Sequence, residues 1–360
     1  MSKINSISTT SEELANKENN TTKVEQNKKV FCPWIKPDSK CHSCLGMLKL
    51  HCEILDFYHF IQLNEEEKKA RIKTYNIIKN IIEENFPDYV CELYGSFRIG
   101  LSLPNSDIDI LILPKEEKNG ENKSNVYSNK NTYNSLKKIY DVFNKNDFTY
   151  IALIVAKVPI IKCTYKETNV QIDISMFKDN GSLAVKTFEN IISIHPEIKP
   201  LMLLIKYILR QRHLNEIYKG GVSSFIIFTL LYYYIIDVNK RINYEVENGK
   251  KEKLLTLAHL LLGFFDFYGF EFNYKKLGIL IRNGCFLYQR TDENKNILSV
   301  ENFQDIYQDM GKNCYQYNKV IDLFKYASRC LTYYDSPVVS YLSAFIEPDD
   351  ILKERNLKNN

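Results

Sequence analysis

The sequence has no apolar stretch long enough to cross a membrane. Its longest one, residues 225–236, is 12 residues long and contains a threonine, whereas a membrane-spanning helix needs about 20 apolar residues. The amino-terminal residues also lack the basic, apolar and small-residue pattern of a secretory leader. We therefore expect no membrane association, and we predict that residues 225–236 form a buried helix.

The sequence also lacks a strong charge and a disulfide pattern. Its formal net charge is +4, which permits an anionic partner without requiring one. The nine cysteines are an odd number and are scattered along the chain, so we expect free thiols in the nucleus or the cytosol. No internal repeat is present.

The distribution of residue types divides the chain into an α/β part and a helical part. Apolar residues follow strand patterns in four segments, 90–96, 107–113, 158–165 and 169–177. A long helix is predicted from its cap Asn64, which three acids follow, to Pro87. Residues 183–341 show almost continuous helical periodicity. Polar composition predicts disordered or mobile segments at 1–29, 115–134 and 350–360.

Two aspartates in one of these strands suggest a metal site. Because successive strand residues face opposite sides, Asp107 and Asp109 point the same way, while Ile108 and Ile110 point into the core. Two carboxylates this close repel each other unless a cation lies between them, and a pair of Mg²⁺ ions meets that need. Asp173, in another predicted strand, offers the third carboxylate that a two-metal site usually has.

A glycine–serine pair upstream of the aspartates fits a phosphate group. Gly95 allows the backbone to approach closely, and the Ser96 hydroxyl and nearby N–H groups can hold a phosphate. The competing interpretation is an edge strand whose outward face carries solvated acids. For the acidic motif alone the two interpretations are equally good, but the glycine–serine pair and the third aspartate together favour the metal site.

These motifs together resemble one family. The segments "LPNSDIDILI", "AKVPIIKCTY", "QIDISMFKDNG", "IKYILRQRHLNEIYKGGVSSF" and "FFDFYG" are similar to those of non-canonical poly(A) RNA polymerases of the TRAMP-complex type, in the DNA polymerase β-like nucleotidyltransferase superfamily. The resemblance covers about residues 31–341. It implies an α+β fold of two lobes, with a nucleotidyltransferase mixed sheet and helices at 66–182. The other lobe is a discontinuous helical central or PAP-associated domain at 30–65 and 183–345, and the tails are 1–29 and 346–360.

The resemblance also implies an activity. It indicates a template-independent RNA 3′-terminal adenylyltransferase, a poly(A) polymerase that uses ATP and two divalent metal ions, Mg²⁺ or Mn²⁺. Asp107, Asp109 and Asp173 are then the catalytic metal ligands, and Asp173 also accepts or orients the proton of the RNA 3′-hydroxyl. RNA surveillance or processing in the nucleus is the implied setting, with the cytoplasm as the alternative.

Further residues correspond to nucleotide contacts of the family. Lys206 and Arg210 lie four apart on one helical face and are expected to meet the β- and γ-phosphates, the alternative being a solvated basic face. Ser224 matches a serine that contacts the triphosphate. Phe225 stands where relatives usually have the tyrosine that stacks on the base, so it keeps the aromatic face but loses the hydroxyl.

The nucleotide-recognition segment matches the family only in part. Glu301 is retained from an acidic motif whose aspartate and proline are replaced by Asn302 and Phe303. Gln308 occupies the base-facing position, which is often asparagine in adenylating members. Uridylating relatives typically have a histidine in this region, and none occurs within 292–331. This favours ATP, and a terminal uridylyltransferase stays the alternative because one hydrogen bond decides the preference.

A group of cysteines and a histidine also suggests zinc. Cys41 and Cys44 have suitable spacing, with Cys32 upstream. His51 and Cys52 are adjacent, however, so their side chains diverge on a helix. We therefore do not predict a zinc site.

The sequence contains no RRM-type aromatic motif and no convincing zinc knuckle. With a net charge of only +4, we expect a modest and salt-sensitive affinity for RNA. The resemblance implies the RNA 3′ end and ATP as substrates, with a zinc-knuckle RNA-binding protein and an RNA helicase as partners. A non-catalytic RNA-binding scaffold on a decayed nucleotidyltransferase fold is the alternative from another class. The retained aspartates, the glycine–serine pair and Lys206 argue against it.

Overall fold

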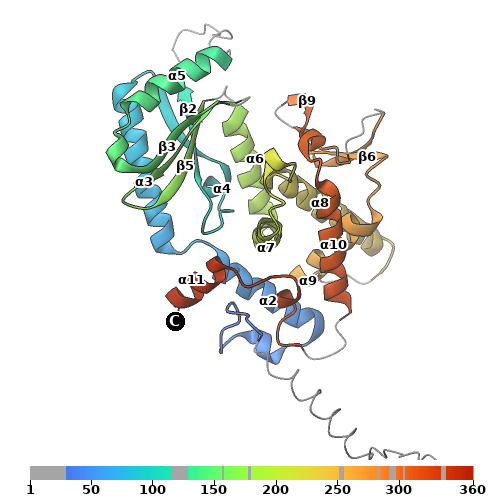
Figure 1. The fold of residues 1–360 in the computed structure, drawn as a ribbon. Coiled ribbons are helices and arrows are strands. Elements are labelled where there is room, and N and C mark those ends of the chain that lie inside the picture. The colour runs from blue at the N-terminus through green and yellow to red at the C-terminus, as the bar shows by residue number, and fades with distance from the viewer. Residues whose placement is uncertain are drawn as a thin grey trace, which may run out of the picture.

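The computed structural model describes residues 30–115, 129–155, 158–176, 180–250, 255–281, 284–291, 297–302, 305–333 and 338–359. They form an α+β structure of two lobes, as predicted (Figure 1). The predicted tail at 1–29 lies outside the described residues, and so does most of the predicted loop at 115–134. The loop prediction is wrong for residues 129–134, because they already belong to a helix.

The first lobe, the sheet lobe, is built on a five-stranded mixed sheet. The strand order is β1-β2-β5-β4-β3, and within it only β2 and β5 are parallel neighbours. The strands are β1 (Tyr89–Tyr94), β2 (Ile108–Pro114), β3 (Phe148–Ile154), β4 (Ile160–Tyr165) and β5 (Val170–Met176). The sequence predicted all but β3, whose residues FTYIALI do not alternate regularly between polar and apolar.

Two long helices cover one face of this sheet, α3 (Glu65–Asn85) and α5 (Asn129–Val142). Ile78 of α3 and Leu136 of α5 are fully buried in one cluster with Ile110 of β2. The start of α3 is confirmed at Asn64, whose side chain accepts from the N–H of Glu67 while the Glu67 carboxylate accepts from the N–H of Asn64. The short helices of this lobe are α4 (Gly95–Arg98) and η3 (Lys145–Asp147).

The second lobe, the helical lobe, has its own core. Its helices are η2 (Lys40–Ser43), α2 (Gly46–Ile61), α6 (Asn180–Ile194), α7 (Ile198–Gln211), η4 (Ile217–Lys219), α8 (Ser224–Glu247), α9 (Leu257–Asp266), η5 (Phe267–Glu271), η7 (Met310–Asn313), α10 (Tyr317–Thr332), η8 (Leu342–Ala344) and α11 (Asp350–Asn359). The predicted buried helix at 225–236 is confirmed within α8, where residues 226–231 are all buried. No helix within the described residues is both long and apolar enough to cross a membrane.

The predicted continuous helical periodicity is interrupted by two small antiparallel sheets. Their strands are β6 (Leu277–Leu280), β7 (Phe286–Gln289), β8 (Glu301–Asn302) and β9 (Asp305–Asp309). Both sheets lie in the helical lobe, beside α8 and α10 (Figure 1). The expectation of a lobe that is almost entirely helical is therefore wrong for this region.

The carboxy-terminal residues 350–359 are helical, so the prediction of a disordered segment at 350–360 is wrong for them. Residues 350–359 form α11, and Leu352 is fully buried in the core of the helical lobe. Arg355 is only 6% exposed. The burial of Leu352 and Arg355 could not be predicted from the polar composition of this segment, because each of them contacts residues far away in the sequence.

One loop of the sheet lobe reaches into the helical lobe. Leu101 and Leu103, between α4 and β2, are 2% and 3% exposed and belong to the core of the helical lobe. The same loop continues into Asp107. The position of Asp107 therefore depends on how the two lobes pack together.

Candidate active site

Asp107, Asp109 and Asp173 lie on one face of the sheet, as predicted. Asp109 in β2 is the direct partner of Asp173 in the parallel strand β5, and Asp107 precedes β2 by one residue. The alternating isoleucines, among them Ile108 and Ile172, are fully buried on the opposite face. The sheet thus gathers three carboxylates on the side that faces the helical lobe.

Gly95 is needed for this arrangement. Its φ is +64°, and a Cβ at this position would lie 1.9 Å from Oδ2 of Asp109. Any side chain here would therefore displace the carboxylate. Ser96 follows in α4, and its hydroxyl oxygen lies 3.0 Å from that of Ser102. The structure shows that Gly95 makes room for Asp109, whereas its expected role beside a phosphate stays a prediction.

Burial and nearby carboxylates disfavour the ionised forms of Asp109 and Asp173. The pKa of Asp109 is raised to about 7, first by burial and then by Asp107 and Asp173. Burial also raises the pKa of Asp173, although its hydrogen bond to Lys162 acts in the opposite direction. A nearby cation favours the ionised form. The site is therefore short of positive charge.

Lys162 supplies one positive charge, and the sequence analysis missed it. Its Nζ lies 2.8 Å from Oδ1 and 3.0 Å from Oδ2 of Asp173, and 3.6 Å from Oδ2 of Asp107. The strand "VPIIKCTY" contained the signal. Lys162 falls between the buried Ile161 and Cys163, so it must share the exposed face with the acids of the neighbouring strand.

The donor set fits a hard divalent cation such as Mg²⁺ or Mn²⁺. Carboxylate oxygens are the ligands that these ions prefer, and a bound cation would favour the ionised form of Asp109, whose pKa is raised by burial and by Asp107 and Asp173. As the side chains stand, no three acidic, histidine or cysteine side chains of the described residues are arranged around one point to hold an ion. The ammonium group of Lys162 already binds Asp107 and Asp173, where such an ion has to sit.

A cavity of about 570 Å³ opens beside the carboxylates, which is within the usual size of a small-molecule site. The sheet lobe lines it with two of the aspartates, and α7 and α8 line it from the helical lobe. Figure 1 shows α6 and α7 between the sheet and the rest of the helical lobe. Seven of the eleven predicted site residues line this cavity: Gly95, Ser96, Asp107, Asp109, Arg210, Ser224 and Phe225.

Lys206 and Arg210 differ in their positions. The Nζ of Lys206 donates to the carbonyl of Leu101 at 2.7 Å. Burial lowers the pKa of Lys206 to about 8, against the attraction of Asp109. Lys206 does not line the cavity and instead ties α7 to the loop that leads to the aspartates. Arg210 does line the cavity, and its Nη1 lies 3.7 Å from Oδ2 of Asp349.

Glu301 and Gln308 do not line the cavity. They lie on the β8–β9 hairpin, where the side chain of Gln308 is exposed. Its amide oxygen accepts a hydrogen bond of 3.0 Å from Nδ2 of Asn302. A contact between Gln308 and a base in the cavity thus stays a prediction, and it requires the hairpin to approach the nucleotide.

Among the described residues, the cysteines and the histidine that suggested zinc do not form a group of three side chains around one point. The Sγ of Cys41 faces the carbonyl of Lys49, and Sγ of Cys44 lies 3.9 Å from Sγ of Cys52. His51 accepts a hydrogen bond of 3.2 Å from the N–H of Leu257 at the start of α9. The side chains of the adjacent His51 and Cys52 therefore diverge, as expected for neighbouring residues on a helix.

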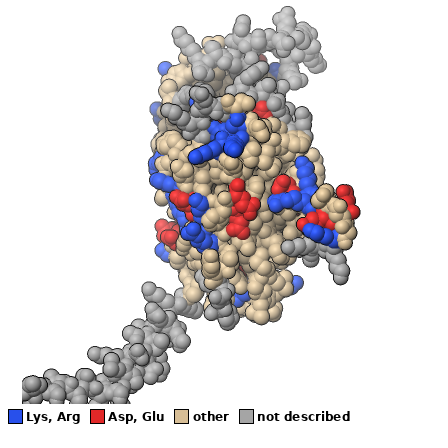
Figure 2. Space-filling view, turned by 90° about the vertical axis from the view of Figure 1, so that its right-hand side faces the viewer, with Lys and Arg blue, Asp and Glu red and all other residues tan. Residues whose placement is uncertain are grey.

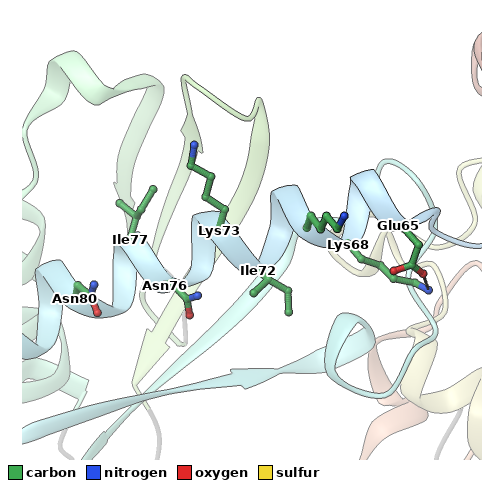
Figure 3. A pocket seen from close by; sticks show the side chains of 8 residues that line it. Glu65, Lys68, Ile72, Lys73, Asn76, Ile77 and Asn80 are labelled. Atoms are coloured by element: carbon green, nitrogen blue, oxygen red, sulfur yellow. Dashed lines mark hydrogen bonds and ion pairs between the residues drawn. The ribbon is translucent and has the colours of Figure 1, made fainter.

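A second hollow, of about 630 Å³, runs along the outer side of α3 (Figure 3). All eight side chains that line it come from that one helix. Its lysines are partly neutralised, since Lys68 pairs with Glu65 and Lys73 pairs with Glu167. No polar groups from different elements converge here, unlike in the cavity beside the aspartates. We therefore place the active site in the smaller cavity.

Solved structures establish the class of the fold. The polymerase core of TRAMP, an RNA surveillance complex, matches with a TM-score of 0.71 and 23% identity, covering 90% of this chain and 98% of that one. The Cid1 poly(U) polymerase matches with a TM-score of 0.69 and 20% identity, covering 84% of this chain and 99% of that one. The chain therefore has the two-lobed fold of these nucleotidyltransferases.

Sequence comparisons define the family within this class. Residues 50–189 match the family "Poly(A) RNA polymerase, mitochondrial-like, central palm domain", and residues 256–307 match "Cid1 family poly A polymerase". Poly(A) RNA polymerase protein 1 of Saccharomyces cerevisiae is 30% identical over 71% of this chain and 38% of its own length. Poly(A) RNA polymerase CID14 of Cryptococcus neoformans is 28% identical over 72% of this chain and 33% of its own length. The chain belongs to the non-canonical poly(A) RNA polymerase family.

Membership of this family does not by itself fix the activity. The chain spans only about a third of the length of the curated relatives named above. Another relative, from Drosophila melanogaster, is named an inactive non-canonical poly(A) RNA polymerase, Trf4-2, and is 28% identical over 79% of this chain and 68% of its own length. The activity has to be argued from the site.

We predict that Asp109→Asn stabilises the metal-free protein at pH 8. In the folded protein the pKa of Asp109 is about 7, whereas that of an unfolded aspartate is about 4. Between these values the folded state holds a proton that the unfolded state has released, so the contribution of Asp109 to stability falls as pH rises from 4 to 7. The asparagine variant should exceed the parent by on the order of 1–4 kcal/mol at pH 8 and equal it near pH 4, in denaturant titrations with a chelator. A difference that does not change with pH would contradict the electrostatic account.

We predict that Gly95→Ala disrupts the carboxylate site, whereas Gly100→Ala does not. Both glycines have positive φ, so each alanine costs about 1–2 kcal/mol of backbone strain. At Gly95 the added Cβ also overlaps Asp109, but at Gly100 its nearest neighbour is Nζ of Lys199 at 3.7 Å. Titration with Mn²⁺, followed by calorimetry, should show at least a tenfold weaker affinity for Gly95→Ala alone. Equal affinities in the two variants would show that Gly95 does not shape the site.

Proposed function

We propose that this chain is a template-independent RNA 3′-terminal adenylyltransferase that uses ATP. The observation that carries the proposal is the shared cavity, in which Asp107 and Asp109 of the sheet lobe face Arg210, Ser224 and Phe225 of the helical lobe. The acidic wall suits metal ions and the reacting phosphate. The opposite wall supplies a cation and a hydroxyl for the other phosphates and an aromatic ring for the base.

In this proposal the three carboxylates would hold two Mg²⁺ or Mn²⁺ ions. When bound, such a pair would stabilise the negative charge that develops around the α-phosphorus during adenylyl transfer. Lys162 has to release Asp107 and Asp173 before both carboxylates can serve as metal ligands. Its ammonium group then becomes available to the phosphates of the substrate.

Asp173 is the group that accepts the proton of the RNA 3′-hydroxyl. The hydroxyl oxygen bonds to the α-phosphorus of ATP, the bond from this phosphorus to the bridging oxygen breaks, and pyrophosphate leaves. The contribution of the protein is the positioning of the two substrates and the stabilisation of charge. The scaffold alternative has no need for three carboxylates with a raised pKa at Asp109, and their repulsion costs stability in a protein that does not bind metal.

The base is held by Phe225 at the start of α8. Its ring centroid lies 5.3 Å from that of Phe188, which also lines the cavity, so the two rings pack against each other. Stacking of this kind accepts any base. The choice of ATP therefore rests on the β8–β9 hairpin and on Gln308 in particular. A terminal uridylyltransferase is the second candidate, because a poly(U) polymerase shares the fold.

The RNA is held weakly by the chain alone. Figure 2 shows one face of the molecule, where the charges form small groups of both signs among uncharged surface. The net charge is +4. Scattered surface lysines and arginines contact RNA mainly through its phosphates, and such contacts weaken steeply as the salt concentration rises. We infer that a zinc-knuckle RNA-binding protein and an RNA helicase assist the polymerase, in nuclear RNA surveillance or processing.

The central prediction is that the purified chain extends a labelled RNA with ATP and Mg²⁺ in preference to the other three nucleotides. Asp107→Ala should lower the rate by about three orders of magnitude or more, because it removes several kcal/mol of charge stabilisation, and should leave the fold intact. Extension on gels, with melting curves of both proteins, measures this. With trap RNA at physiological salt, few nucleotides should be added per encounter. If the protein is folded and none of the four nucleotides supports extension of the RNA, the scaffold alternative is favoured.

We also predict that Gln308→His raises the use of UTP relative to ATP by about tenfold, the effect of one hydrogen bond to a base edge. The measurement is the ratio of kcat/KM for the two nucleotides. Lys312→His, which adds an imidazole four residues away in η7, is the control and should leave the ratio unchanged. The same ratio in all three proteins would remove Gln308 from base recognition.

A further inference from the structure

Arg71 holds the loop that leads to Asp107. It lies in α3 and is only 5% exposed. Its Nη2 donates to the carbonyls of Pro104 and Ser106, at 2.6 and 3.1 Å. Ser106 immediately precedes Asp107 in the chain, so these two hydrogen bonds fix the backbone from which the Asp107 carboxylate projects. A shift of the guanidinium group moves that carboxylate.

Arg355 of α11 holds the helix from which Arg71 projects. Its Nη1 donates to the carbonyl of Phe60, in the last turn of α2, at 2.9 Å. Its Nη2 lies 2.5 Å from Oε2 of Glu67, in the first turn of α3. Figure 1 shows α11 beside the junction of α2 and α3. Arg355 therefore joins the helical lobe to the sheet lobe at the point where the chain crosses between them.

Glu67 connects the two arginines. Its carboxylate accepts from Arg355 and from the N–H of Asn64, and its main-chain carbonyl accepts from Nη1 of Arg71 at 3.3 Å. The contacts run from α11 through Glu67 and Arg71 to the loop before Asp107. Every step is a hydrogen bond or an ion pair between described residues.

The same carboxy-terminal segment also holds the other side of the cavity. Oδ1 of Asp349 accepts from the hydroxyl of Tyr207 at 2.6 Å and from the N–H of Leu352 at 3.0 Å. Oδ2 lies 3.7 Å from Nη1 of Arg210, which lines the cavity from the last turn of α7. Asp349 thus fixes Arg210 to the start of α11.

Burying the two arginines of this hydrogen-bond network costs more free energy than a purely structural contact needs. Arg71 and Arg355 are both buried, and the Nε atom of each lacks a hydrogen-bond partner in the structure. Burying charged groups costs free energy, and apolar residues at such positions often give equal or greater stability. What the arginines provide, and apolar side chains cannot, is a fixed direction for the main-chain carbonyls that they bind.

We propose that residues 347–355 form a brace that positions the active site from two sides. Its positioning residues are Arg355, which acts through Arg71 of α3, and Asp349. Through Arg355 and Arg71 the brace sets Asp107 and hence the binding of metal. Through Asp349 it sets Arg210 and hence the binding of the nucleotide. The catalytic meaning of the brace rests on the proposed function, but its effect on metal affinity does not.

The test separates the two arms of the brace with single substitutions. Arg355→Met should weaken the affinity for Mn²⁺, measured by calorimetry without RNA or nucleotide, by about tenfold and lower kcat with little change in the KM for ATP. Asp349→Asn should raise the KM for ATP by at least threefold and leave the affinity for Mn²⁺ unchanged. Arg290→Met is the matched control, because Arg290 also donates to main-chain carbonyls, those of Tyr274 and Ile297, and does not line the cavity.

A double-mutant cycle checks the path through Glu67. The effects of Arg355→Met and Glu67→Gln on Mn²⁺ affinity should be less than additive, since both break one ion pair. All assays are run at least 10 °C below the melting temperature of each variant. Should Arg355→Met not fold, Arg355→Lys takes its place, with a smaller loss of affinity because lysine keeps the charge but not both hydrogen bonds.

The outcomes distinguish this inference from the proposed function. If the parent protein extends no RNA and Arg355→Met still weakens the affinity for Mn²⁺, the brace is supported and the proposed adenylyltransferase activity is contradicted. Normal extension of RNA, with Arg355→Met and Asp349→Asn both indistinguishable from Arg290→Met, overturns the brace and leaves the proposed activity standing. A loss of Mn²⁺ affinity in Arg290→Met equal to that in Arg355→Met also overturns it, because the effect is then general destabilisation.

Discussion

Mutual repulsion among three carboxylates is the constraint on which the rest of the structure depends. The register of β2 and β5 places Asp109 beside Asp173, on the only parallel pair of the main sheet within the described residues. Burial increases the repulsion, because the low polarity of the surroundings weakens its screening. The positive charge of Lys162 and the absence of a side chain at Gly95 make the arrangement tolerable in the protein alone.

The two lobes share the task of holding these carboxylates. The loop before Asp107 is fixed from the helical lobe by the buried Leu101 and Leu103 and by the Nζ of Lys206, and from the sheet lobe by Arg71. The cavity then forms where the lobes meet, lined by two of the acids from the sheet lobe and by Arg210, Ser224 and Phe225 from the helical lobe. Any change in the packing of the lobes therefore changes the shape of this cavity.

Local sequence patterns predicted the parts of the site that depend on local geometry. Strand alternation was enough to place Asp107, Asp109 and Asp173 on one face. The same alternation contained the signal for Lys162, which lies between the buried Ile161 and Cys163 and was missed. It missed β3, where the alternation is irregular. Arg71, Arg355 and Asp349 had no local signal, because each acts through residues that are distant in the sequence. The polar sequence of α11 predicted a tail for the same reason.

The most direct test of the central claim is a crystal structure with Mn²⁺ and a non-hydrolysable ATP analogue, using anomalous scattering to locate the metal. The account predicts manganese bound by Asp107, Asp109 and Asp173, with Nζ of Lys162 moved away from Asp173 and the triphosphate lying between the aspartates and Arg210. Manganese bound elsewhere, or Lys162 still bonded to Asp173 beside a bound nucleotide, would contradict it.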